Sequence, residues 1–236
     1  MKPSSLLLLL PLLVSCNAPA PYATTEGILR PGATLRVEIA RGRVDAYHPV
    51  AGRRAGLFTV SATAPSNQTP PAPRMRARGK DVTVTAGSLA SLLVRVPAAV
   101  DLVVSSRDGD VNVTDIGGNA QIDAKHGNVT VMLPGYAQAS VGEGTVAVTM
   151  GAMHWPGTLR FSASHGDITL RVPAPAAFSA HLQTDNGTLF TDFALRGSSH
   201  GSVETIDGSV NGGGAQRIWA HTGAGAVRLL RMQPQP

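Results

Sequence analysis

Three of the seven histidines stand directly before a glycine, and this repeated position is the first sign of possible chemistry in the chain. They are His126, His165 and His200, and imidazole is the commonest metal ligand among side chains. Yet the sequence has no His-x-x-x-His pair and only one cysteine, Cys16, whereas metal sites combine His and Cys at short spacings. We therefore predict solvated histidines at turns and no metal or other cofactor. His126 and His165 are kept as candidate surface-binding residues.

Aspartates also recur near the glycines, and two carboxylates about 5 to 9.5 Å apart could hydrolyse a glycosidic bond. An aspartate at a turn has a simpler role, because its side chain accepts hydrogen bonds from nearby backbone N–H groups. All but Asp123 lie within two residues of a glycine, so the turn role explains the pattern. A carbohydrate-active lyase or hydrolase is the alternative. The recurring acids are Asp108, Asp110, Asp123, Asp167, Asp185 and Asp207.

One string matches a catalytic motif. Residues 197 to 201 read Gly-Ser-Ser-His-Gly and fit the nucleophile elbow Gly-x-Ser-x-Gly, with Ser199 at the serine position. That motif has meaning only where a strand turns sharply into a helix. Residues 202 to 206 read as another strand, so we predict no serine nucleophile and a chain that is not an enzyme.

The chain has two tryptophans, and an indole face can stack on a sugar ring. Trp219 stands between Ile218 and Ala220, which places it at an outward position of a strand that buries its neighbours. Trp219 is therefore a third candidate surface-binding residue, while nothing singles out Trp155.

The elements that must position these residues repeat a five-residue phrase of glycine, a small or polar residue, an aliphatic residue, any residue and another aliphatic residue. Full copies begin at Gly109, Gly127, Gly144, Gly166 and Gly225, weaker copies at Gly187 and Gly208, and an earlier relative at Gly42. From Gly109 onward, successive glycines are 17 to 22 residues apart.

Apolar and polar residues alternate before most of these glycines, as in 120–125, 159–164 and 178–183. A period of two predicts strands with one buried face, and no segment of the mature chain shows a helical period. A strand, turn and strand every 20 residues or so predicts an all-β, right-handed parallel β-solenoid, β-helix-like, with an irregular N-terminal β cap. In it Val111, Val129, Val146 and Ile168 would share one dry core. A β-sandwich of stacked hairpins is the alternative.

The segment 94–113 resembles a known family. It reads Val-Arg-Val-Pro, a short link, Asp-Leu-Val-Val-Ser-Ser-Arg-Asp, then Gly-Asp-Val-Asn-Val. This order is similar to the bacterial β-strand-repeat domain labelled "putative adhesin", and the resemblance covers residues 34 to 230. It implies an exported protein with no established catalytic residues. The adhesin label itself rests on architecture, so it implies fold more than function.

The N-terminus predicts export. Lys2 precedes an apolar run from Leu6 to Leu13, and residues 13–16 read Leu-Val-Ser-Cys, which resembles the lipobox of bacterial lipoproteins. In that family the cysteine becomes the lipidated N-terminus, so Cys16 would anchor the chain in a membrane of the cell envelope, outside the cytoplasm. Asn17 mildly favours an outer membrane where two membranes exist. An ordinary residue near a secretory cleavage site is the alternative for Cys16.

The pattern divides the chain into a signal peptide (1–15), a lipid-anchored tether (16–33), a β-strand-repeat domain (34–232) with an inserted loop (62–80), and a tail (233–236). Residues 17 to 80 carry ten basic residues against three acids. This basic part either lies against anionic lipid headgroups or, as we prefer, simply keeps a surface soluble. Nucleic acid is a poor candidate partner, because no aromatic residues are interleaved with the arginines.

Together these features predict a non-catalytic envelope lipoprotein that presents a β-repeat surface for adhesion or partner binding. The expected contacts are the membrane, through Cys16, and a polysaccharide or an envelope protein. The alternatives are a carbohydrate-active β-helix enzyme and an envelope-stress or assembly component.

Overall fold

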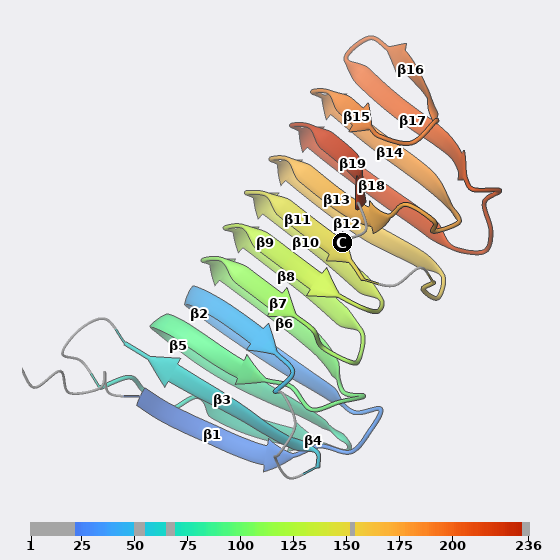
Figure 1. Cartoon of the computed structure of the whole chain (residues 1–236). Coiled ribbons are helices and arrows are strands. Elements are labelled where there is room, and N and C mark those ends of the chain that lie inside the picture. Colours follow the sequence, from blue (N-terminus) through green and yellow to red (C-terminus); the bar gives the residue numbers. More distant parts are fainter. Residues whose placement is uncertain (1–21, 50–54, 65–68, 152–153, 233–236) are drawn as a thin grey trace, which may run out of the picture.

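The computed structural model describes residues 22–49, 55–64, 69–151 and 154–232, and all regular structure in these ranges is β-strand. The all-β prediction is confirmed: nineteen strands join into one mostly parallel sheet that does not close (Figure 1). No helix in these ranges has the length and hydrophobicity of a membrane span. The signal peptide, Cys16 and the tail predicted for 233–236 lie outside the described residues.

The repeated phrase builds a repeat unit, which is a longer strand, a glycine corner and a shorter strand. Longer strands of successive units pair in parallel, and so do the shorter ones. Because strands of a hairpin pair antiparallel, the alternative of stacked hairpins is wrong for these units. They are β6 (Asp101–Asp108) with β7 (Val111–Thr114), β8 (Ala120–His126) with β9 (Val129–Leu133), β10 (Ala137–Glu143) with β11 (Val146–Met150), and β12 (Thr158–His165) with β13 (Ile168–Pro173).

At the N-terminal end, two long strands each run the length of a whole unit. They are β2 (Thr34–Tyr47) and β5 (Asp81–Arg95). On one side β2 pairs in parallel with both β6 and β7, and on the other it pairs with β5. The earlier strand β2 therefore lies between two later units.

The C-terminal end departs from chain order in the same way. The last unit, β18 (Arg217–Ala224) with β19 (Val227–Met232), pairs in parallel with β12 and β13 on one side. On the other side it pairs in parallel with β14 (Phe178–Asn186) and β15 (Leu189–Thr191). Figure 1 shows this red unit inserted between two orange ones.

Antiparallel strands cover both ends of the stack. At β5 these are β1 (Tyr22–Ile28), β3 (Leu57–Thr63) and β4 (Arg74–Arg78), and at β14 they are β17 (Val203–Val210) and β16 (Arg196–His200). Such strands protect an open edge from pairing with other chains. We call the first group the N-terminal cap.

The structure shows strands at three places where the sequence does not predict them. The tether predicted for 16–33 overlaps the N-terminal cap, since residues 22–28 form β1 and Leu29 is buried. The inserted loop predicted for 62–80 contains the end of β3 and all of β4. The weak repeat at Gly208 lies inside the antiparallel strand β17 and makes no corner.

One aliphatic core runs through the stack. The first buried position of the shorter strands holds Val111, Val129, Val146, Ile168 and Val227, in consecutive register and each at most 1% exposed. Burying one such side chain contributes about 1.5 to 3 kcal/mol. Because the same position of each unit lies above the last, branched aliphatic side chains fill this column, while Phe58, Phe161 and Phe178 are buried elsewhere in the core.

The corner glycines form a second continuous feature, which we call the glycine column. A Cβ placed on Gly166 would lie 1.8 Å from the carbonyl oxygen of Gly144, and similar clashes occur throughout the column. All its members except Gly187 also have φ between +126° and +142°. Backbone hydrogen bonds continue through the corners, as from Gly144 N to His165 O at 3.0 Å. The column consists of Gly42, Gly109, Gly127, Gly144, Gly166, Gly225 and Gly187.

We predict that Gly166→Ala lowers the free energy of unfolding by at least about 2 kcal/mol, because the new methyl group forces two units apart as well as straining φ. Gly157→Ala is the matched control: its φ is +66°, but nothing lies within 4 Å of the added Cβ. The control should lose only about 1 kcal/mol. Denaturant titration measures both, and equal losses would show that close stacking does not constrain the corner.

Candidate functional site

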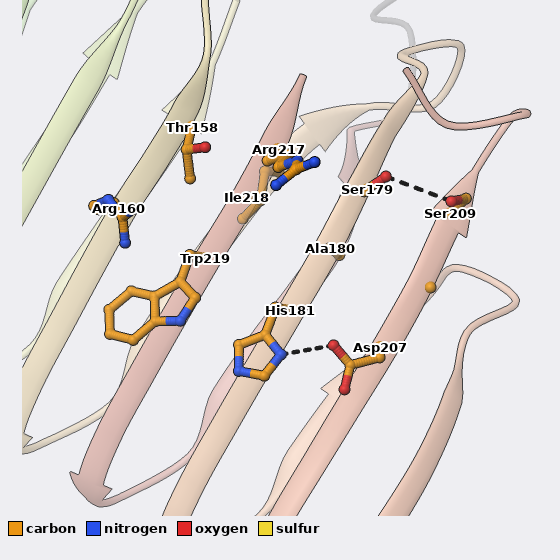
Figure 2. Close-up of a pocket in the computed structure, with 11 residues that line it drawn as sticks. Thr158, Arg160, Ser179, Ala180, His181, Asp207, Ser209, Arg217, Ile218 and Trp219 are labelled. Atoms are coloured by element: carbon orange, nitrogen blue, oxygen red, sulfur yellow. Dashed lines mark hydrogen bonds and ion pairs between the residues drawn. The ribbon is translucent and has the colours of Figure 1, made fainter. Parts of the chain in front are cut away.

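A shallow groove of about 440 Å³ crosses the outward face of the longer strands near the C-terminal end of the stack. It spans β12, β18, β14 and β17 (Figure 2). Side chains that point outward from paired strands line up in rows across the sheet. One row holds Arg160, Trp219, His181 and Asp207, and the adjacent row holds Thr158, Arg217, Ser179 and Ser209.

Trp219 lies in the middle of the groove and is half-buried. The guanidinium carbon of Arg160 is 5.8 Å from the centre of the indole ring, and the His221 ring is also 5.8 Å away. In Figure 2 the indole is seen broad face on, between Arg160 and His181. The outward position expected for Trp219 is therefore correct, while its role in binding stays a prediction. Trp155, in contrast, is only 4% exposed and packs in the core.

The far side of the groove is polar. His181 Nδ1 lies 2.6 Å from Asp207 Oδ1, and the hydroxyl oxygens of Ser179 and Ser209 are 3.4 Å apart. The groove thus offers a cation and an aromatic ring on one side, and hydroxyl, imidazole and carboxylate groups on the other. This combination suits a polar ligand with both a flat face and hydrogen-bonding groups.

The other two candidate residues lie elsewhere. His126 and His165 belong to a row at the ends of the longer strands, where Asp108, His126, Glu143 and His165 follow in register. His126 Nδ1 lies 3.0 Å from Asp108 Oδ1. His165 is five residues beyond Arg160 on the same strand, hence about 17 Å from the row of Trp219. The structure brings the two histidines to one row, but separates them from Trp219.

Two of the acids near the glycines, Asp110 and Asp167, bond to backbone groups at the corners. Asp110 accepts a hydrogen bond from Asn128 N at 2.8 Å, and Asn128 in turn accepts one from Thr145 N at 3.1 Å. Asp167 accepts 2.8 Å and 2.7 Å hydrogen bonds from Ala226 N and from Arg228 Nη1. Within the described ranges, no three His, Cys, Asp or Glu side chains are placed to hold a metal. Asp110 and Asp167 thus bond to corner N–H groups, as the sequence indicates, but these groups belong to the neighbouring unit rather than to the turn of the acid itself.

Among the aspartates near the glycines, Asp167 and Asp185 have lowered pKa values. The backbone N–H of Ala226, followed by the guanidinium of Arg228, holds the pKa of Asp167 below its ordinary value. The side-chain amide of Gln183, followed by His221, lowers the pKa of Asp185. Both groups are therefore carboxylates at neutral pH and are not suited to act as general acids.

The Gly-x-Ser-x-Gly string lies in a β-hairpin. Ser199 belongs to β16, which is exposed along its length, and β16 pairs antiparallel with β17 directly after the turn. A strand follows where the nucleophile elbow requires a helix. His200 lies at the end of the same exposed strand.

Sequence reasoning missed Arg160, His181 and Arg217 as neighbours of Trp219. Arg160 and Trp219 are far apart in the chain and meet only because β18 is inserted between β12 and β14. The sequence indicates only that each of these residues faces outward from its own strand.

We predict that the stability difference between the wild-type chain and Asp167→Asn depends on pH. Because folding lowers the pKa of Asp167, its stabilisation is complete above the unfolded pKa of about 3.9 and is lost as the pH falls through the lower folded value. The side chain is 42% exposed, so solvent screening limits the effect to about 1 kcal/mol. Denaturant titrations should give a constant difference from pH 7 to about pH 5 that shrinks below about pH 4. A difference that grows on acidification would contradict this assignment.

No family model matches the sequence, and no curated protein matches it. Among solved structures, a protein from Clostridium sporogenes described as a "putative cell adhesion protein" is similar, with a TM-score of 0.50 and 11% identity over 89% of this chain and 100% of that one. A "putative adhesin" from Parabacteroides merdae aligns over 90% of this chain and 97% of its own, with a TM-score of 0.25 and 8% identity. The first likeness shows a shared fold, and the resemblance read from the repeats is thereby confirmed at that level.

Proposed function

We propose that this chain is a non-catalytic, lipid-anchored β-solenoid of the cell envelope, which holds a binding groove away from the membrane for adhesion to a partner. The observation that carries the proposal is the position of the Trp219 groove at the opposite end of the stack from β1, the first described strand. The cell adhesion protein with the same fold is consistent with this role.

The solenoid interpretation rests on the pairing of successive units. From β6 to β13, each longer strand pairs with the longer strand of the next unit, each shorter strand does likewise, and all share one core. A chain that passes repeatedly through the same two strand positions is a coil. Connections between parallel strands are right-handed in about 98% of cases, so we infer a right-handed coil.

The dimensions of the stack suit a spacer. Six strand-to-strand steps separate β5, at the N-terminal cap, from β18, which carries Trp219. At about 4.8 Å a step, this is about 29 Å. Cys16 precedes Tyr22 by six residues, which limits its distance from β1 to about 22 Å. A lipid on Cys16 would therefore keep the N-terminal cap near the membrane, with the groove further out.

The basic residues of the N-terminal cap also favour an orientation with the cap toward the membrane. Strand β4 of the N-terminal cap is exposed along its whole length and carries Arg74, Arg76 and Arg78. Each basic residue near an anionic membrane surface contributes about 1 kcal/mol of attraction. The cap thus has the charge expected of the end that faces lipid headgroups.

The contacts of the acids favour binding over catalysis. Asp110 and Asp167 bond to corner backbone groups, while Asp108, Asp185 and Asp207 each bond to a histidine. The partners of these five acids lie in separate rows, and each of these acids is already bonded. A role in envelope assembly would use the same presentation, with a protein in the groove.

We predict that the wild-type chain sediments with membranes and is released by detergent, whereas Cys16→Ala moves to the soluble extracytoplasmic fraction because it cannot be acylated. Trp219→Ala is the control, and it should remain in the membrane fraction like the wild-type chain. Fractionation with immunoblotting measures all three. If Cys16→Ala stayed in the membrane fraction after loss of residues 1–15, checked by its mass, the lipid anchor and the proposed presentation would both be wrong.

A further inference from the structure

The Trp219 groove combines three features whose joint chemistry identifies a ligand class. The first is the aromatic ring: Trp219 lies on an outward position at the centre of the groove and is only half-buried. Its flat, apolar face is able to pack against the C–H face of a sugar ring. Arg160 beside it holds the indole in place through a cation–π contact at 5.8 Å.

The second feature is positive charge without a partner. Arg160 and Arg217 are both exposed and both line the groove. Neither takes part in any of the six ion pairs within the described part of the chain. A planar guanidinium binds a carboxylate or sulfate through two parallel hydrogen bonds, which are stronger than bonds between neutral groups.

The third feature is the set of hydrogen-bonding groups across the groove. Ser179, Ser209 and His181 present two hydroxyls and an imidazole beside the tryptophan. Asp207, the acid in the groove, lies 2.6 Å from His181 and two strands away from Trp219, so it is held apart from the arginines. Hydroxyl-rich ligands match this side, and anionic groups match the other.

We propose that the groove binds an acidic polysaccharide, with one sugar ring on Trp219 and its carboxylate or sulfate on Arg160 and Arg217. The row from Arg160 to Asp207 crosses three strand spacings, about 14 Å. This length fits a short run of sugars better than a single ring. This inference rests on the proposed function, because it names the ligand of the groove that the anchored chain would present.

The polarity of the groove favours this ligand over the alternatives. A neutral glycan would leave both arginines without anionic partners. An acidic peptide would satisfy the arginines but would not use the half-buried indole ring and the hydroxyl pair together. A single-stranded nucleic acid would stack on Trp219, but no second Phe, Tyr or Trp lines the groove, and the other ring there, His181, is bonded to Asp207.

The test is calorimetric titration of the full mature chain in detergent with oligogalacturonate, a polymer of uronic acids. A neutral oligogalactose of equal length, polyglutamate and a single-stranded oligonucleotide are the comparison ligands. We expect oligogalacturonate to bind at least tenfold more tightly than each of the three. Equal binding of any comparison ligand, or no binding of oligogalacturonate at millimolar concentration, would overturn the proposal.

Variants locate the binding. Trp219→Ala and Arg160→Gln should each weaken oligogalacturonate binding about tenfold, equivalent to about 1.4 kcal/mol. Arg171→Gln is the matched control, because Arg171 is exposed on the shorter strand β13, outside the groove. It should change the affinity less than twofold. Trp219→Phe keeps a ring and should retain most of the affinity if Trp219→Ala does not fold.

Unchanged affinity in Arg160→Gln and in a folded Trp219→Ala would overturn the assignment to this groove. Membrane fractionation separates this failure from failure of the proposed function. A chain that fractionates with membranes but does not bind oligogalacturonate loses only the ligand assignment. A chain that binds it but is soluble loses only the anchored presentation.

Discussion

The contact between stacked corner glycines is the constraint on which the rest of the structure depends. Each corner brings a glycine so close to the carbonyl oxygen of the next that no Cβ fits between them, as at Gly144 and Gly166. This approach keeps the backbone ladder continuous through the bend, so the strands on both sides of it stay in register. In-register strands place Val146 over Ile168 and their equivalents in a dry core. The same register aligns the outward side chains into rows.

Those rows form the candidate groove only where strands distant in the chain become neighbours. Insertion of β18 between β12 and β14 puts Trp219 between Arg160 and His181 and builds the groove. At the other end, insertion of β2 between β5 and β6 ties the start of the domain to its middle. The N-terminal cap and the groove thus lie at opposite ends of one stack, as the proposed spacer role requires.

The sequence predicts the local part of this architecture because local signals encode it. Gly109, Gly127 and Gly144 mark their own corners, and the alternation around Trp219 indicates that it faces outward. The stacking order is not local: Ile218 and Leu159 follow the same apolar pattern as every other unit, so any two strands would pair equally well by pattern alone. The sequence does not predict strand β4, because all five of its residues are exposed and apolar and polar residues do not alternate between a buried and an exposed face. The partners of Trp219 could not be predicted without the insertion of β18.

Distances between spin labels test the stacking order most directly. In a Cys16→Ala background, Asn112→Cys is paired with either Arg228→Cys or Phe190→Cys, all on the outward row of the shorter strands. The structure places Arg228 four strand spacings from Asn112 and Phe190 five, which gives backbone distances of about 19 Å and about 24 Å. Pulsed electron paramagnetic resonance should therefore find the pair with residue 228 closer than the pair with residue 190. The reverse order would mean that the units stack as they follow in the chain, and a distance far outside this range would mean that they do not stack at all.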